Sequence, residues 1–138
     1  MFNPTLSFFS SYTCYGEPRP QSGPDRRKSV VIKTFQLRLM DPREEVMDEK
    51  SMELLTYTLQ EALPKAMNGV IHVAPMPCAS GFHFVLAGNY KAKNVIVNIQ
   101  DAFRRGLKQI PSLKLSEDDS QNLYYLIKDA LDEKWEIE

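Results

Sequence analysis

The side chains best suited to metal binding or nucleophilic chemistry are few, because the chain contains two cysteines and two histidines. His72 and His83 fall on segments that we expect to be neighbouring strands, and Cys78 falls on the turn between them. Zinc takes such ligands in tetrahedral geometry. However, the spacing of these three residues matches no common zinc motif, and the chain has no CxxC pair. We therefore expect no metal site and no cofactor.

Cys78 is also the natural candidate for a thiol nucleophile, which would need a positioned base such as one of the two histidines. The residues that follow it, Ala79-Ser80-Gly81, have the composition of an ordinary turn, and nothing around them resembles a protease signature. The chain also lacks a glycine-rich phosphate loop. Its paired carboxylates lie at expected helix starts, where the helix dipole accounts for them. We assign no catalytic residue and expect the protein not to be an enzyme.

Charge is strongly segregated along the chain, although the total is only −1. Residues 1–39 carry a net charge of +4, residues 40–68 carry −4, residues 69–115 carry +5 and residues 116–138 carry −6. Patches of a single sign steer partners and set the register of a complex. This pattern indicates an interaction surface without naming the partner.

A set of basic residues falls on one turn and on the polar face of an expected helix, and we take its members as candidate contacts for phosphate groups of nucleic acid or anionic lipid. These residues are Lys91, Lys93, Arg104, Arg105 and Lys108. Against this reading, the isoelectric point near 6.1 is well below that of a typical nucleic-acid-binding domain. A second reading is an ordinary solvated helix face. A third is that the acidic first and last helices neutralise these basic residues within the fold.

The first 28 residues differ from the rest, since they hold four of the nine prolines. We interpret residues 1–28 as an extended tail and linker rich in proline and aromatic residues, and residues 29–138 as a single globular domain. Clusters of exposed aromatic side chains are usually buried against another surface. The tail therefore offers candidate contacts with a protein partner or a second copy. These candidates are Phe8, Phe9, Tyr12 and Tyr15.

Hydrophobic periodicity predicts an α+β fold in the order strand–helix–strand–strand–helix–helix. Residues 94–110 are ambiguous, because Val95-Ile96-Val97 favours a strand whereas Ile96, Ile99 and Phe103 recur at helical spacing, and we choose helix. A small antiparallel sheet of three or more strands covered by helices would bury these stripes. The expected strands are 29–40, 70–74 and 82–87, and the expected helices are 41–67, 94–110 and a segment after 116.

Together these observations favour a non-enzymatic protein–protein interaction module, such as an adaptor, an inhibitor or an assembly subunit, which self-associates through opposite charge and the aromatic tail. The alternative is a regulator that binds nucleic acid or a membrane surface through the basic hairpin and helix. The chain has no apolar run long enough to span a membrane and no recognisable secretory signal. We therefore expect it in the cytoplasm.

Overall fold

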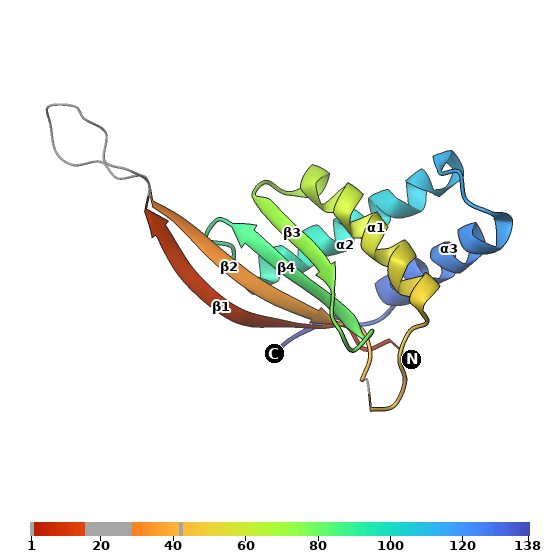
Figure 1. Ribbon diagram of the computed structural model, residues 1–138, viewed down its shortest axis with the longest axis horizontal. Coiled ribbons are helices and arrows are strands. Elements are labelled where there is room, and N and C mark those ends of the chain that lie inside the picture. The colour runs from red at the N-terminus through yellow and green to blue at the C-terminus, as the bar shows by residue number, and fades with distance from the viewer. Residues whose placement is uncertain (1, 16–28, 42) are drawn as a thin grey trace, which may run out of the picture.

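The computed structural model describes residues 2–15, 29–41 and 43–138. A five-stranded sheet carries three helices on one face, which confirms the predicted α+β class and element order (Figure 1). The strand order is β3-β4-β2-β1-β5, and all neighbours are antiparallel except β1 and β5, which run parallel. The strands are β1 (Thr5–Tyr15), β2 (Ser29–Arg38), β3 (Val70–Pro75), β4 (Gly81–Ala87) and β5 (Glu136–Ile137).

The helices are α1 (Glu49–Ala66), α2 (Ala92–Gln109) and α3 (Glu117–Asp132), with a short 3₁₀ turn, η1 (Ile110–Ser112), after α2. The helical reading of the ambiguous segment 94–110 is therefore confirmed. Each helix buries one apolar stripe against the sheet or a neighbouring helix, as shown by Leu55 on α1, Phe103 on α2 and Ile127 on α3, none of which is exposed. No helix in the described part of the chain is long and apolar enough to cross a membrane.

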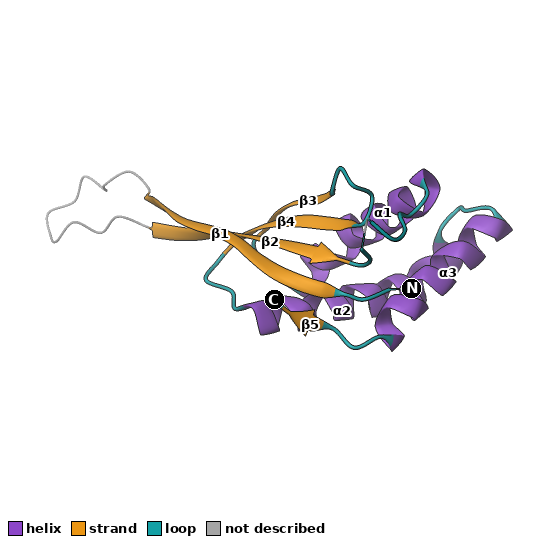
Figure 2. Ribbon diagram, turned by 90° about the horizontal axis from the view of Figure 1, so that it is seen from below, coloured by secondary structure: helices purple, strands orange, loops and turns teal. Residues whose placement is uncertain are grey.

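The sheet alternates between a buried and an uncovered face, as strand geometry requires. On β4, Phe82, Phe84 and Leu86 point into the core, whereas His83 and Val85 lie on the other face and are half-buried. Figure 2 shows the helices gathered on one side of the sheet. The core therefore lies in a single layer between sheet and helices.

Residues 5–15, which the sequence analysis placed in the extended tail, form β1 and pair along their whole length with β2. The rest of the proposed linker, residues 16–28, lies outside the described residues. The register between β1 and β2 shifts between Phe8 and Ser10, because Phe9 is an extra residue on β1. This bulge interrupts the alternation by which a strand is recognised in a sequence.

The first helix begins later than predicted. Asp41 does not start α1; its carboxylate instead accepts hydrogen bonds from the backbone and guanidinium of Arg43. These hydrogen bonds and the nearby guanidinium charge lower the pKa of Asp41. The helix starts at Glu49, where Asp48 is the N-cap and accepts from Ser51 N–H at 2.7 Å. Residues 43–46 are exposed, so a helix over this segment would have no apolar face to bury against the core and would not be stabilised by packing.

Candidate active site

The turn between β3 and β4 holds Cys78 and is closed by backbone hydrogen bonds. Within the turn, Met76 N–H donates to Gly81 O at 2.9 Å and Ala79 N–H donates to Met76 O at 3.0 Å. The turn is also tied to the rest of the fold. Leu39 N–H at the end of β2 donates to Ser80 O at 2.8 Å, and Met47 N–H donates to Ala79 O at 3.0 Å just before α1. The turn that holds Cys78 is therefore tied to the segment that follows β2 and to the segment that precedes α1.

Two residues of this turn show why small side chains occupy it. Ala79 has φ of 53°, and it is the one non-glycine residue with positive φ in the described chain. Such a conformation costs roughly 1–2 kcal/mol for a residue with a Cβ. A Cβ on Gly81 would overlap the backbone carbonyl of Leu37 and lie 2.9 Å from Arg38 Cα. The close approach of β4 to β2 thus requires glycine at this position.

One hydroxyl group contacts the Cys78 thiol. Cys78 Sγ is 2.7 Å from Ser80 Oγ, and Ser80 is fully buried while Cys78 is exposed. A hydroxyl can both donate and accept, so Ser80 can stabilise the thiol or the thiolate. The sulfur is therefore accessible to solvent, while the buried hydroxyl lies in contact with it.

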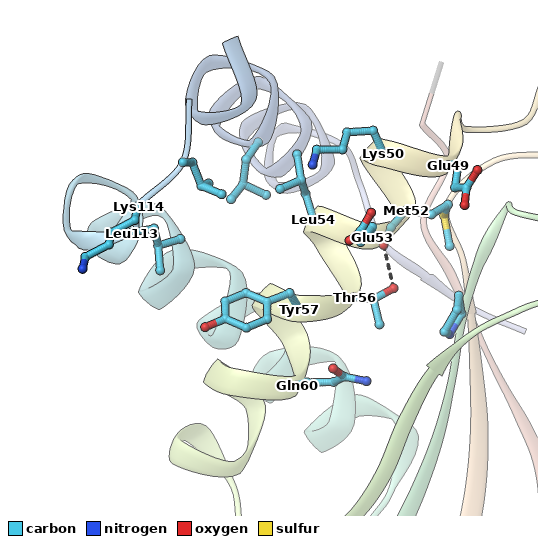
Figure 3. A pocket seen from close by; sticks show the side chains of 13 residues that line it. Glu49, Lys50, Met52, Glu53, Leu54, Thr56, Tyr57, Gln60, Leu113 and Lys114 are labelled. Atoms are coloured by element: carbon cyan, nitrogen blue, oxygen red, sulfur yellow. Dashed lines mark hydrogen bonds between the residues drawn. The ribbon is translucent and has the colours of Figure 1, made fainter. Parts of the chain in front are cut away.

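A cavity of about 680 Å³ lies between the first turns of α1 and the segment that follows η1. Pro75, three residues before Cys78, lines it. Figure 3 shows the ring of Tyr57 directed from α1 toward Leu113. The lining residues are Glu49, Lys50, Met52, Glu53, Leu54, Thr56, Tyr57, Gln60, Pro75, Leu113, Lys114, Leu115 and Leu123.

The cavity combines an apolar wall with charged groups of both signs. Met52 and Leu123 are buried in the core beneath it, whereas Glu53 and Lys114 are exposed. Lys50 pairs with Asp119 at 3.4 Å across the gap between α1 and α3. A ligand with an apolar middle and separate charged ends fits these surroundings.

The two histidines and Cys78 do not form a ligand cluster. The register pairs His83 with Ala74 and His72 with Val85, so the imidazoles occupy diagonal positions on the uncovered face of the sheet. The ring of His83 contacts Phe9 edge-on, with centroids 5.8 Å apart. Among residues 2–15, 29–41 and 43–138, no three His, Cys, Asp or Glu side chains are placed to hold a metal ion. We derive no step through a metal.

The predicted basic residues lie on the surface and are not brought to the cavity. Their side chains are all exposed on α2 or at its start. Arg105 pairs with Asp101 of the same helix at 2.9 Å, and within the described residues no ion pair joins the five to α3. The idea that the acidic last helix neutralises them is not supported by any contact in that part of the chain.

The aromatic partner-contact candidates lie on β1. Phe8, Phe9 and Tyr12 are 50%, 63% and 55% exposed. Phe8 packs edge-on against Phe35 at 5.6 Å between centroids, so part of its ring is used within the fold. Tyr15 ends β1, and its side chain lies outside what the structure describes.

Comparison with known proteins defines the class to which this fold and turn belong. The family model of S-ribosylhomocysteinase (LuxS) matches residues 21–122. This chain therefore belongs to the S-ribosylhomocysteinase (LuxS) family. The matched range includes the Cys78 turn, all of α1 and α2, and the segment at residues 113–115 that closes the cavity.

Curated relatives carry the same description. The chain is 31% identical over 84 residues to an S-ribosylhomocysteine lyase of Clostridioides difficile, which covers 61% of this chain and 56% of that protein. It is 27% identical over 82 residues to an S-ribosylhomocysteine lyase of Clostridium perfringens, which covers 59% of this chain and 54% of that protein. The chain thus spans about half the length of the relatives it matches.

These findings overturn the function predicted from the sequence. A non-enzymatic interaction module, a regulatory or assembly protein, and a nucleic-acid-binding or membrane-surface regulator are all wrong, because the family and the relatives are enzymes. The residue that the prediction discarded is Cys78. Its turn was read as ordinary from its composition, but the contact with Ser80 and the positive φ of Ala79 appear only in three dimensions.

Proposed function

We propose that this chain cleaves S-ribosylhomocysteine, or a ribosyl thioether of the same class, and that Cys78 transfers the proton. Membership of the S-ribosylhomocysteinase family supports the substrate class. The observation that carries the residue assignment is the exposed Cys78 thiol, 2.7 Å from the buried hydroxyl of Ser80, on the turn that follows Pro75, which lines a cavity with charged groups.

The chemistry follows from what a lyase must do to a thioether. Breaking a C–S bond without water requires removal of a proton from the carbon next to the one that carries sulfur. The electron pair of that C–H bond forms the new double bond, and sulfur leaves as the homocysteine thiolate. Cys78 as a thiolate would take the proton, and Ser80 would hold its sulfur in place.

The cavity that Pro75 lines would receive the amino-acid end of the substrate. Its ammonium and carboxylate groups are matched by Glu53 and Lys114, which are exposed at the rim. The methylene groups of homocysteine would lie against the apolar wall, which includes Leu113 and Leu115. We also place the chain in the cytoplasm as part of this proposal.

The test is release of free homocysteine from S-ribosylhomocysteine, measured with a thiol reagent after removal of the protein. We expect release by the wild-type chain and a loss of about 10²-fold or more in Cys78→Ala. Cys14→Ser is the matched control, because Cys14 is the other free, exposed cysteine and lies on β1. It should release homocysteine at the wild-type rate.

Two results would contradict the proposal. Binding of S-ribosylhomocysteine in calorimetry without release of homocysteine would refute lyase activity. Release that persists at the wild-type rate in Cys78→Ala would refute the role of Cys78 while leaving the substrate assignment in place.

A further inference from the structure

The cavity between α1 and the segment that follows η1 is larger than the substrate end that the proposed function places in it. Its volume is about 680 Å³. Cavities of about 300–1,000 Å³ hold drug-sized ligands, whereas the amino-acid end of S-ribosylhomocysteine is a short chain that carries an ammonium and a carboxylate. Much of the cavity is therefore left over for a bulkier side chain than that of homocysteine.

The most buried side chains that line the cavity are apolar. Met52 and Leu54 of α1 and Leu123 of α3 line it and are all buried. Leu113 and Leu115 line it from the segment after η1 and are half-buried. These side chains come from three separate parts of the fold, so an apolar group placed among them would lose contact with water on several sides.

The uncharged polar side chains of the wall are already used within the fold. Thr56 Oγ1 donates to Met52 O at 2.6 Å, the bond marked in Figure 3. Gln60 Nε2 donates to Val73 O at 3.0 Å. No buried side-chain nitrogen or oxygen of the described residues lacks a hydrogen-bond partner. The buried part of the wall therefore disfavours a polar ligand group, which would lose its water without gaining a partner.

Charges of both signs at the rim have no ion-pair partner among the described residues. Glu49, Glu53 and Lys114 line the cavity and are exposed, and no ion pair between described residues includes any of them. Lys50 differs, because it pairs with Asp119 at 3.4 Å. The free carboxylates come from α1 and the free ammonium comes from the segment after η1, as Figure 3 shows. Such a rim complements the two charges of an α-amino acid.

We propose that this cavity binds free α-amino acids with large apolar or aromatic side chains. Their ammonium and carboxylate lie between Glu53 and Lys114, a placement that rests on the proposed function, which puts those of homocysteine there. The side chain enters the apolar interior beside Tyr57, whose half-exposed ring it covers. Because the rim groups are shared, such an amino acid competes with S-ribosylhomocysteine.

The first experiment is calorimetric titration of the full chain with L-phenylalanine in the absence of S-ribosylhomocysteine. L-Alanine is the matched ligand, because it carries the same charged groups on a much smaller side chain. We expect phenylalanine to bind at least about tenfold more tightly, since the cavity removes its ring from water. Phenylethylamine lacks the carboxylate and phenylpropionate lacks the ammonium, so each should bind at least about tenfold more weakly than phenylalanine.

Substitutions at the rim test where the charged groups lie. Lys114→Ala and Glu53→Gln should each weaken phenylalanine binding at least about fivefold, because each removes one charge that the ligand meets. Lys108→Ala and Glu61→Gln are the matched controls, since both residues are exposed and neither lines the cavity. Both controls should bind phenylalanine as the wild type does.

A substitution in the wall tests where the side chain lies. Leu113→Asp places a carboxylate against the apolar interior and should reduce phenylalanine binding at least about tenfold. Its folding is checked by the thermal midpoint. If Leu113→Asp does not fold, Tyr57→Ala gives the same test at an exposed position, because it removes the ring that covers the ligand.

Three results would overturn this inference: no binding of phenylalanine, equal affinity for alanine and phenylalanine, or phenylalanine binding that all of these cavity variants leave unchanged. The lyase test gives separate outcomes. A chain that binds phenylalanine in the cavity but releases no homocysteine would refute the proposed activity and keep the amino-acid site. Release of homocysteine by a chain that does not bind phenylalanine would refute the amino-acid site alone.

Discussion

Gly81→Ala tests whether the Cys78 turn is held by the close approach of β4 to β2. The added Cβ would overlap the carbonyl oxygen of Leu37 and lie 2.9 Å from Arg38 Cα, and both are backbone atoms of a central strand. A backbone clash cannot be relieved by a rotamer change. The strands must separate locally, and the turn must move with them.

The expected cost has two parts. Overpacking a tight site costs about 1–3 kcal/mol. Moving the turn also weakens the 2.8 Å hydrogen bond from Leu39 N–H to Ser80 O, and a buried hydrogen bond of this kind contributes about 1 kcal/mol. We therefore expect Gly81→Ala to lower the free energy of unfolding by about 2–4 kcal/mol, which leaves a domain of ordinary stability folded.

Urea unfolding followed by tryptophan fluorescence measures this change, because Trp135 is the single tryptophan and packs edge-on against Phe103 in the core. A lower midpoint with an unchanged m-value is the expected signature. Ala79→Gly is the matched control in the same turn. It relieves a positive φ but adds freedom to the unfolded chain, so it should change stability by less than about 1 kcal/mol. A Gly81→Ala chain as stable as the wild type would refute the reasoning.

Two further substitutions test the helices that support the site. In Gly106→Ala the new Cβ would overlap Thr58 Cγ2, so we expect a loss of about 1–3 kcal/mol despite better helix propensity; adding Thr58→Ser should recover it in a double-mutant cycle. Asp48→Ala should cost about 1 kcal/mol at pH 7 by removing the α1 cap. Because the Ser51 backbone hydrogen bond lowers the pKa of Asp48, its carboxylate stabilises the fold above its ordinary pKa and stops doing so as pH falls through the lower folded value. The difference between wild type and Asp48→Ala, measured by urea unfolding, should therefore shrink in acid, and a constant difference would contradict the assignment.

The sequence predicted those elements in which burial of one face makes apolar residues recur at a regular spacing. Ile96, Ile99 and Phe103 repeat at helical spacing, and this repeat outweighed the strand preference of Val95-Ile96-Val97, because α2 buries that stripe. The tail prediction for residues 5–15 missed β1 for the opposite reason. The extra residue Phe9 puts two aromatic residues side by side and breaks the alternation, so the strand could not be recognised by its period.

Other boundaries depended on contacts that no local pattern records. Asp41 is a residue type that often caps helices, but its carboxylate accepts a hydrogen bond from Arg43. Helix α1 begins only after Asp48, which is its cap. β5 is two residues long and exists because Glu136 N–H donates to Pro4 O at the far end of the chain. A backbone hydrogen bond between residues so distant in sequence produces no regular spacing of apolar residues, so the strand could not be predicted from the sequence.

The candidate site was missed because its chemistry is fixed by the backbone and not by side-chain charge. The segregated charges drew attention to residues such as Arg104 and Lys108, which are exposed and lie apart from the cavity. The residues that position Cys78 are small and neutral: Ser80 is fully buried against the sulfur, and Gly81 is pressed onto β2. In the sequence alone, small neutral residues of this kind are typical of any turn. Their arrangement around a single cysteine between two strands is informative, because a turn that only joins strands needs neither a buried hydroxyl nor a backbone contact too close for a Cβ.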